Sequence, residues 1–286
     1  MKSKSRLGQN FLTDTHAAAR IVSALGEFHG RTVLEIGPGR GAITGALAAR
    51  ARHVLAVELD SQLAARLREK FPADRVAIIE QDILNFDFAA AFASLALCPG
   101  ASGRLLVIGN LPYYITSPIL LKLAASHAAL DLAVLMVQRE VADRVAAAPG
   151  SRDYGLLTVT VQMYGPVERL FTLPPSAFSP PPEVHSTVFR WRFAPRFSEL
   201  GVEEVPFLRL VRAAFAQKRK TLANNLRAAG ISAATADAAF TAAAVPAGAR
   251  AESLSIEALS AIWRFLRAED TTVGLADAPN TKTEEI

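Results

Sequence analysis

The chain has 286 residues and a net charge of +4, and 51% of its residues are hydrophobic and 20% charged. This composition can bury enough apolar surface to offset the entropy lost on folding, which excludes a disordered protein. No apolar run reaches the roughly 20 residues needed to cross a bilayer. The basic segment from Lys2 to Arg6 leads into Gln9 and Asn10 instead of an apolar signal core, and the single Cys98 excludes a disulfide framework. We expect a cytoplasmic protein without a membrane span.

Between residues 32 and 193, runs rich in Val, Ile and Leu alternate with longer segments of helical period. This alternation predicts an α/β fold in which helices wrap a mixed, mainly parallel sheet. Gly165–Pro166 and the Pro-rich stretch Pro174–Pro182 separate the last two strand candidates, so we expect these two to pair antiparallel near the sheet edge. The expected strands are Thr32–Ile36, Val54–Glu58, Val76–Glu80, Arg104–Gly109, Ala133–Gln138, Leu157–Tyr164 and Thr187–Phe193.

After Pro195 the strand-like runs disappear, and helical patterns predict a small all-helical C-terminal domain. Beyond Asp270 the sequence is polar and has no period, which is typical of a frayed tail. We therefore expect a sheet domain over residues 1–195, a helical domain over residues 196–269 and a disordered tail over residues 270–286. The expected helices of the second domain are Pro206–Ala229, Ala233–Ala244 and Ser255–Ala268.

The first expected strand runs into a glycine-rich turn, Gly37-Pro38-Gly39-Arg40-Gly41, and then a helix. Glycines let the backbone approach a ligand closely because no side chain stands in the way. The second strand ends at Glu58, placed to accept hydrogen bonds from ribose hydroxyls. The third ends near Asp82, where a carboxylate could meet an adenine amino group. Structural roles stay open here, since Glu58 could pair with the following helix and Asp82 could cap a turn.

The fourth expected strand ends in Gly109-Asn110-Leu111-Pro112-Tyr113-Tyr114. An exocyclic amine has its lone pair delocalised into the ring, and an enzyme that methylates it must free that pair. The Asn110 side-chain oxygen and a neighbouring backbone carbonyl can accept both amine hydrogens, and Pro112 fixes the turn that aims the carbonyl. Tyr113 can stack on the base. Positioning of this kind supplies a large part of catalysis without a strong general base.

The stretch Val205–Ala236 contains no acidic residue. Such a basic density is expected of a surface that meets a polyanion, although a solvated helix face is the alternative. On one continuous helix, Arg209, Arg212, Lys220 and Arg227 share a side, which could bind phosphates while the opposite stripe is buried. The candidate nucleic-acid contacts are Arg209, Arg212, Lys218, Arg219, Lys220 and Arg227.

From about Lys2 to Arg267 the chain resembles the ribosomal RNA small-subunit adenine dimethyltransferase family. The resemblance rests on five motifs in the family's order, and the tail is not part of it. The motifs are Lys4-Ser5-Arg6-Leu7-Gly8-Gln9-Asn10-Phe11-Leu12, Glu35-Ile36-Gly37-Pro38-Gly39, Gly109-Asn110-Leu111-Pro112-Tyr113, Phe178-Ser179-Pro180-Pro181-Pro182-Glu183-Val184 and Lys218-Arg219-Lys220-Thr221-Leu222.

The resemblance implies a Rossmann-like class I methyltransferase fold and S-adenosyl-L-methionine as cofactor. It places Asn10 and Leu12 over the methionine end, and it places Phe178 opposite Tyr113 across a flipped-out target base. The implied product is two adjacent dimethylated adenosines near the 3′ end of small-subunit (16S) rRNA. The implied partner is a pre-30S particle in late small-subunit biogenesis. We expect the protein to bind this particle as a monomer. The implied cofactor contacts are Asn10, Leu12, Gly37, Glu58, Asp82 and Asn110, and the implied catalytic residues are Asn110, Leu111, Pro112, Tyr113 and Phe178.

Other chemistries find less support. The five histidines have no metal-ligand spacing with each other or with Cys98, so we expect no metal site. Ser186 beside His185 is interpreted as ordinary strand sequence. Three alternatives stay open: a large-subunit rRNA adenine methyltransferase of the macrolide-resistance type, a non-enzymatic ribosome-assembly or transcription factor, and a nicotinamide dehydrogenase. Mapping of the methylated base would separate the first, and cofactor titration the last.

Overall fold

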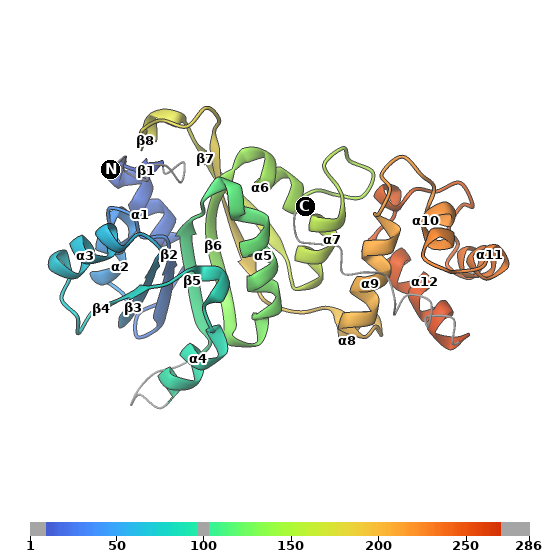
Figure 1. Ribbon diagram of the computed structural model, residues 1–286, viewed down its shortest axis with the longest axis horizontal. Helices are drawn as coiled ribbons and strands as arrows, with labels where there is room; N and C mark the ends of the chain where they lie inside the picture. Colours follow the sequence, from blue (N-terminus) through green and yellow to red (C-terminus); the bar gives the residue numbers. More distant parts are fainter. Residues whose placement is uncertain (1–9, 97–102, 270–286) are drawn as a thin grey trace, which may run out of the picture. The chain divides into compact units, whose positions relative to one another are not determined.

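One seven-stranded sheet forms the framework of the N-terminal part of the chain, in the order β4-β3-β2-β5-β6-β9-β7 (Figure 1). Strands β4, β3, β2, β5 and β6 run parallel, whereas β9 pairs antiparallel with both β6 and β7. All residues of β2 are buried, as expected of a parallel strand with both faces covered. The bounds are β2 Thr32–Ile36, β3 His53–Glu58, β4 Val76–Glu80, β5 Leu105–Asn110, β6 Leu130–Gln138, β7 Val167–Leu173 and β9 Ser186–Arg192.

The computed structural model describes residues 10–96 and 103–269, and Cys98 and the expected tail lie outside them. Contacts divide the chain into two units. The sheet unit is Met1–Ala142 with Pro166–Ala194, and the helical unit is Asp143–Gly165 with Pro195–Ile286. The segment Asp143–Gly165 thus groups with the helical unit, which the expected boundary at residue 195 did not include. None of the described helices is long and apolar enough to cross a membrane.

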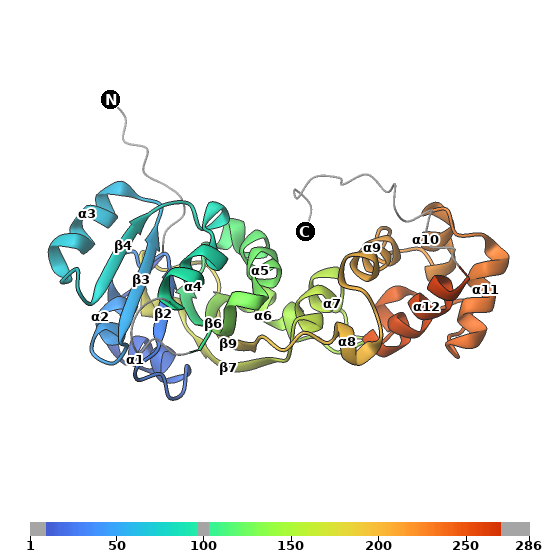
Figure 2. The same cartoon turned by 90° about the horizontal axis from the view of Figure 1, so that it is seen from below.

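Helices cover both faces of the sheet, with α1 and α2 on one face and α4 and α5 on the other (Figure 2). Asp14 and Asp60 begin α1 and α3 by accepting hydrogen bonds from backbone N–H groups of the first turn. A second, two-stranded sheet pairs β1 with β8. The bounds are β1 Phe11–Leu12, α1 Thr15–Ser23, α2 Ala42–Ala48, α3 Ser61–Lys70, η1 Ile83–Asn85, α4 Phe88–Ala96, η2 Tyr113–Ile115, α5 Thr116–Ala125, η3 His127–Ala129, α6 Arg139–Val145, η4 Pro175–Ala177 and β8 Phe178–Ser179.

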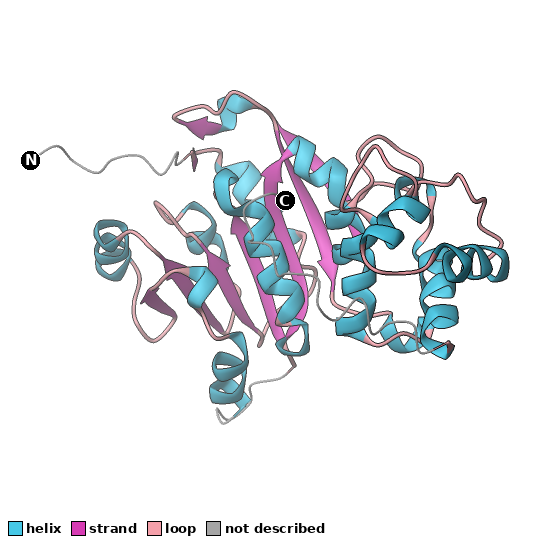
Figure 3. Cartoon of the chain, turned by 45° about the vertical axis from the view of Figure 1, so that its right-hand side comes forward, coloured by secondary structure: helices cyan, strands magenta, loops and turns pink. Residues whose placement is uncertain are grey.

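The expected edge strand Leu157–Tyr164 is wrong, because these residues form helix α7, Leu156–Met163. Nearly every side of α7 is buried, so its apolar run carries no helical period and resembles a buried strand. The edge strand that pairs with the outer side of β9 is β7, which follows α7 along the chain. A register shift between Arg169 and Phe171 interrupts the alternation of β7, which is why its sequence does not look like a strand. Figure 3 shows the strands of the sheet unit together.

The helical unit is built from short helices around an apolar core that includes Phe207, Leu226, Phe240 and Trp263. The expected helix Pro206–Ala229 is wrong as a single element, because the chain leaves the helix after Ala214 and starts again at Leu222. The bounds are α8 Phe197–Leu200, α9 Glu204–Ala214, α10 Leu222–Ala228, α11 Ala233–Ala242, η5 Ala251–Ser253 and α12 Ile256–Ala268.

Two side chains explain the break between α9 and α10. Thr221 accepts a hydrogen bond from the backbone N–H of Asn224 and so begins α10. The buried Asn225 donates its side-chain amide to the carbonyl oxygens of Ala214 and Gln217, at 2.6 and 3.3 Å, and so satisfies acceptors at the end of α9. The residues between the helices form an exposed basic turn.

Candidate active site

A pocket opens at the carboxyl ends of β2, β3, β4 and β5, the edge at which parallel sheets bind ligands. The residues that line it come from the strand ends, from the turns that follow them and from β1. They include all the predicted cofactor contacts and the whole predicted Asn110–Tyr113 segment. The lining residues are Asn10–Leu12, Glu35–Arg40, Ala42, Ile43, Val57–Leu59, Gln81–Ile83 and Asn110–Ile115.

The glycine-rich turn after β2 allows a close approach of the backbone to this pocket. Gly37 and Gly39 have φ angles of +63° and +57°, which side chains rarely adopt. A Cβ atom on Gly39 would also lie 3.0 Å from the ring of Phe11. The Arg40 guanidinium lies over that same ring, 4.4 Å from its centre. The turn therefore packs directly against β1 at the pocket.

Glu58 lies at the end of β3 with only 5% of its surface exposed. One carboxylate oxygen accepts the backbone N–H of Gly39 and the other accepts the backbone N–H of Asp60, each at 3.0 Å. Each oxygen keeps a further lone pair, so the carboxylate can still accept ligand hydroxyls. Glu58 thus holds the glycine-rich turn and also lines the pocket.

Glu35, in the middle of the sheet unit, is an acid that sequence reasoning did not single out. It is 1% exposed, and its carboxylate accepts a 2.6 Å hydrogen bond from the Thr44 hydroxyl. Burial raises the pKa of Glu35 from 4.5 to about 7, the nearby negative charge of Glu58 adds to the rise, and the Thr44 hydrogen bond opposes it. The signal available in the sequence was a charged residue inside a continuous apolar strand.

Asp82 both caps a turn and lines the pocket. Its Oδ1 accepts a 2.9 Å hydrogen bond from the backbone N–H of Leu84 and so begins η1. The residue also lines the pocket, next to Gln81 and Ile83. A capping bond occupies one carboxylate oxygen only, so the other role is compatible with it.

Asn110 ends β5 with its side-chain amide at the pocket. Its Nδ2 donates a 3.0 Å hydrogen bond to the backbone carbonyl of Asn10, a residue 100 positions earlier in the chain. Its Oδ1 is buried and has no hydrogen-bond partner. An acceptor left in this state is costly in a folded protein unless a ligand satisfies it. The geometry therefore supplies a fixed, unfilled hydrogen-bond acceptor at the pocket.

The segment β1 is held beside the pocket from two directions. It pairs antiparallel with β8, with Phe11 opposite Ser179 and Leu12 opposite Phe178. The backbone N–H and the hydroxyl of Thr13 both donate to the carbonyl of Ala177, at 2.9 and 3.1 Å. Contacts from distant parts of the chain thus bring Asn10 and Leu12 to the pocket lining.

The family model described as ribosomal RNA adenine dimethylase matches residues 1–267 of the chain. The protein belongs to this family. A ribosomal RNA small subunit methyltransferase A of Acidobacterium capsulatum is 57% identical over 266 residues, which cover 93% of this chain and 92% of the relative. The protein of the same name from Koribacter versatilis is 49% identical over 270 residues, covering 92% and 94% of the two chains.

Two solved structures share the architecture of this dimethylase. The 23S rRNA methyltransferase ErmE superposes with a TM-score of 0.67 at 26% identity. The match covers 90% of this chain and 100% of the ErmE chain. A dimethyladenosine transferase from Plasmodium falciparum superposes with a TM-score of 0.73 at 22% identity, covering 91% and 98%, and at this identity it supports the fold alone. The predicted class I methyltransferase fold with a helical C-terminal region is confirmed, and the protein is an rRNA methyltransferase, not a dehydrogenase.

Phe178 is the predicted site residue that the structure does not bring to the dimethylase pocket. It lies on β8, is 4% exposed and packs in the core cluster with Leu12, Leu173 and Ala177. It is absent from the residues that line the pocket. Stacking of Phe178 on a target base stays a prediction, and it requires the side chain to leave this core.

Tyr113 is partly buried and has a partner that the sequence did not reveal. Its hydroxyl shares a 2.8 Å hydrogen bond with the hydroxyl of Ser186, which is fully buried. Burial raises the pKa of Tyr113, and the hydrogen bond to Ser186 opposes the rise. Ser186 is not among the residues that line the pocket.

The predicted RNA contacts of this dimethylase are all exposed side chains of the helical unit. Their arrangement on one helix is wrong, because Arg209 and Arg212 lie on α9, Arg227 lies on α10, and the three residues from Lys218 to Lys220 form the turn between them. The helix that begins after this turn is tied to a neighbouring loop by the 2.8 Å bond from Leu222 N–H to the Ala249 carbonyl.

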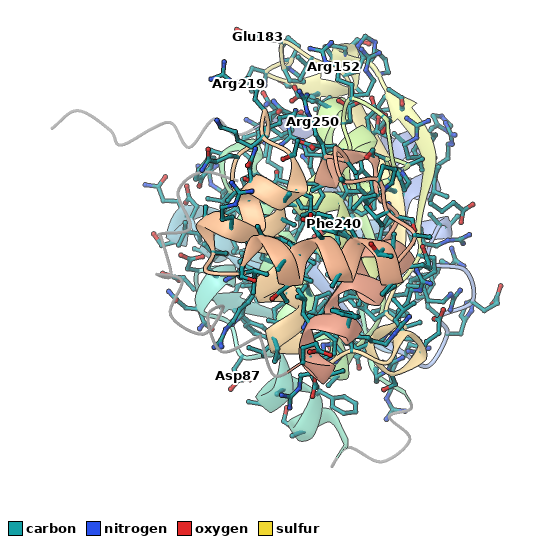
Figure 4. The ribbon with its side chains drawn as sticks, turned by 90° about the vertical axis from the view of Figure 1, so that its right-hand side faces the viewer. Asp87, Arg152, Glu183, Arg219, Phe240 and Arg250 are labelled. Atoms are coloured by element: carbon teal, nitrogen blue, oxygen red, sulfur yellow. The ribbon has the colours of Figure 1, made fainter. Side chains whose placement is uncertain are left out.

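A second loop joins the same region of the helical unit. The backbone N–H of Gly150 donates a 2.7 Å hydrogen bond to the carbonyl of Glu252. Arg152, Arg219 and Arg250, labelled in Figure 4, belong to these loops. Exposed cations of the helical unit thus lie on loops as well as on the helices α9 and α10. Among residues 10–96 and 103–269, no cluster of three or more His, Cys, Asp or Glu could hold a metal ion.

Proposed function

We propose that this protein transfers methyl groups from S-adenosyl-L-methionine to the exocyclic amines of two adjacent adenosines near the 3′ end of small-subunit rRNA. It acts as a cytoplasmic monomer on a pre-30S particle, late in small-subunit biogenesis. The observation that carries the proposal is the buried Oδ1 of Asn110, a residue of the pocket lining, which has no hydrogen-bond partner. An amine that donates to this oxygen satisfies it.

The pocket suits the proposed cofactor part by part. Glu58 has acceptor capacity for ribose hydroxyls, and Asp82 lies at the next strand end for the adenine amine. The glycine-rich turn leaves room beside Gly37, and Asn10 and Leu12 of the pocket lining are the residues that the family resemblance assigns to the methionine end. When bound, the cofactor supplies an electrophilic methyl group on a positively charged sulfur.

The contribution of the protein to the reaction is mainly positioning. Because Nδ2 of Asn110 donates to the Asn10 carbonyl, Oδ1 is the atom left for the target amine. Accepting an amine hydrogen there directs the nitrogen lone pair out of conjugation and toward the methyl group. Tyr113 supports the ring of the base. The methylated amine would be positively charged and strongly acidic, so its proton can pass to water and no strongly basic side chain is needed.

The small-subunit substrate is supported by the relatives that carry that name, at 57% and 49% identity. The likeness to the 23S enzyme ErmE is weaker, at 26% identity. The exposed cations Arg209, Arg212 and Arg227 and the basic turn from Lys218 to Lys220 are the proposed rRNA contacts, because phosphates dominate the affinity of proteins for nucleic acid.

Methyl transfer to isolated subunits tests this function. Labelled S-adenosyl-L-methionine is supplied to small subunits that lack the modification, to fully modified small subunits and to large subunits. We expect label only on the first, and primer extension should stop at two adjacent adenosines near the 3′ end of the rRNA. Label on the large subunit would identify the macrolide-resistance type of enzyme, and no label on either would favour a non-enzymatic assembly factor.

Replacing Glu58 with Ala tests the cofactor site. The ribose hydroxyls lose a charged acceptor, and hydrogen bonds to charged groups contribute roughly 1.5–3 kcal/mol. We expect the dissociation constant of the cofactor to rise at least about tenfold by calorimetry. Glu80→Ala is the matched control, because Glu80 lies opposite Glu58 on β4, is not part of the pocket lining and pairs with Arg68 at the surface. Equal constants for the two variants would remove Glu58 from the site.

A further inference from the structure

Ser186 occupies a rigid position next to the pocket without lining it. It is the first residue of β9 and is paired on one side with Gln138 of β6 and on the other with Leu173 of β7. Its side chain has no exposed surface. A hydroxyl buried in this way is costly unless it is hydrogen-bonded, and the partner that the structure provides is the phenol of Tyr113, 2.8 Å away.

Tyr113 is thereby held at both ends of its side chain. Its backbone belongs to η2, directly after the Asn110–Pro112 turn. This turn is itself tied down, because the N–H of Leu111 donates to the Met136 carbonyl and the hydroxyl of Thr116 donates to the Pro112 carbonyl. The phenol oxygen at the far end is tied to Ser186. Because the phenol oxygen is fixed, rotation about the Cα–Cβ bond of Tyr113, which would swing the ring away from its place, is restricted.

We propose that Ser186 is a positioning residue that holds the Tyr113 ring axis in the direction needed to support the target adenine. The inference deepens the proposed function and depends on it. Methyl transfer requires the amine to be aligned within roughly a few tenths of an ångström. Movement of the Tyr113 ring therefore lowers the fraction of complexes that can react. Ser186 touches neither substrate nor cofactor and acts through Tyr113 alone.

The first test is a double-mutant cycle on methyl transfer to unmodified small subunits. Ser186→Ala should lower kcat by roughly three- to tenfold, the range expected for the loss of one neutral hydrogen bond. The KM for subunits and the dissociation constant of the cofactor should stay within about twofold of the parent values, because the effect is purely positional. Tyr113→Phe should give a similar loss. The double variant should be no slower than either single variant, because both remove the same bond.

A matched control separates positioning from general loss of stability. Ser260 is also fully buried, and its hydroxyl donates a 2.8 Å hydrogen bond within α12. Ser260→Ala removes a comparable bond from the helical unit and should leave kcat unchanged. If Ser186→Ala does not fold, Tyr113→Phe removes the bond from its partly buried end and still measures its effect.

The second test does not depend on activity. The chain has four tyrosines, so the ring carbon that bears the hydroxyl can be labelled and resolved by NMR, and Tyr113→Phe assigns its signal. Ser186→Ala should shift the Tyr113 signal and leave those of Tyr154 and Tyr164 in place. An unchanged Tyr113 signal, a parental kcat for Ser186→Ala, or additive losses in the double variant would each overturn the inference. Absence of transfer by the parent protein would instead reject the proposed function, and the role of Ser186 with it.

Discussion

Asn110 has two ends with different tasks, and this division makes its replacement informative. Asn110→Ala removes the acceptor at the pocket together with the donor to the Asn10 carbonyl. By analogy with the loss of one fixed catalytic hydrogen-bonding group, we expect turnover to fall roughly a hundredfold. Affinity for small subunits should change little, because the side chain is a small part of any rRNA contact. Single-turnover rates and subunit binding measure the two effects separately, and activity within a few-fold of the parent would exclude the proposed role.

Glu35 makes the stability of the sheet unit depend on pH. Its folded pKa of about 7 lies above its ordinary value of 4.5, so the folded state binds the proton more tightly. The resulting stabilisation is complete below the ordinary pKa and is lost as the pH rises through about 7. Glu35→Gln keeps an acceptor for Thr44 but removes the titration. Urea midpoints measured from about pH 5 to about pH 8 should fall more steeply for the parent than for the variant. Parallel profiles would show that Glu35 is not proton-linked.

At the scale of elements, the basic turn between α9 and α10 is the part of the helical unit best suited to phosphate. Lys220→Glu should weaken binding to small subunits and lower the slope of log affinity against log salt by roughly 0.7–0.9. Arg66→Glu on α3 is the control, since Arg66 is an exposed cation of the sheet unit and the change in net charge is equal. Cofactor affinity should be unchanged in both. Identical salt slopes for the two variants would mean that the turn is a solvated surface.

At the scale of the whole molecule, the cofactor pocket lies entirely within the sheet unit. A ligand present at a hundred times its dissociation constant stabilises the state that binds it by about 2.7 kcal/mol. We expect S-adenosylhomocysteine to slow amide hydrogen exchange in β2, β3 and β5, while the amides of α12 exchange at their original rates. Equal protection in α12 would show that the two units unfold as one body and would contradict the predicted domain division.

Local sequence rules were sufficient for much of this protein. The strands β2 to β6 could be predicted from their apolar runs. The glycine-rich turn could be predicted because its backbone conformation is one that only glycine adopts readily. Glu58, Asp82 and Asn110 were predicted as pocket residues because parallel strands end at one edge of a sheet. The family followed from motifs of consecutive residues. Each of these signals is contained in a short run of consecutive residues.

Tertiary structure alone decided what depends on residues far apart in the chain. The bond from Asn110 to Asn10 spans 100 positions and that from Tyr113 to Ser186 spans 73, and neither leaves a local trace. The burial of Phe178 against Leu12 likewise depends on residues far apart in the chain. The hydrogen bonds from Asn225 to Ala214 and Gln217 end a helix that the sequence periodicity alone would continue. α7 was mistaken for a strand because full burial erases the period that separates helix from strand. Periodicity reports only which sides face water, whereas these features depend on which distant groups satisfy each other.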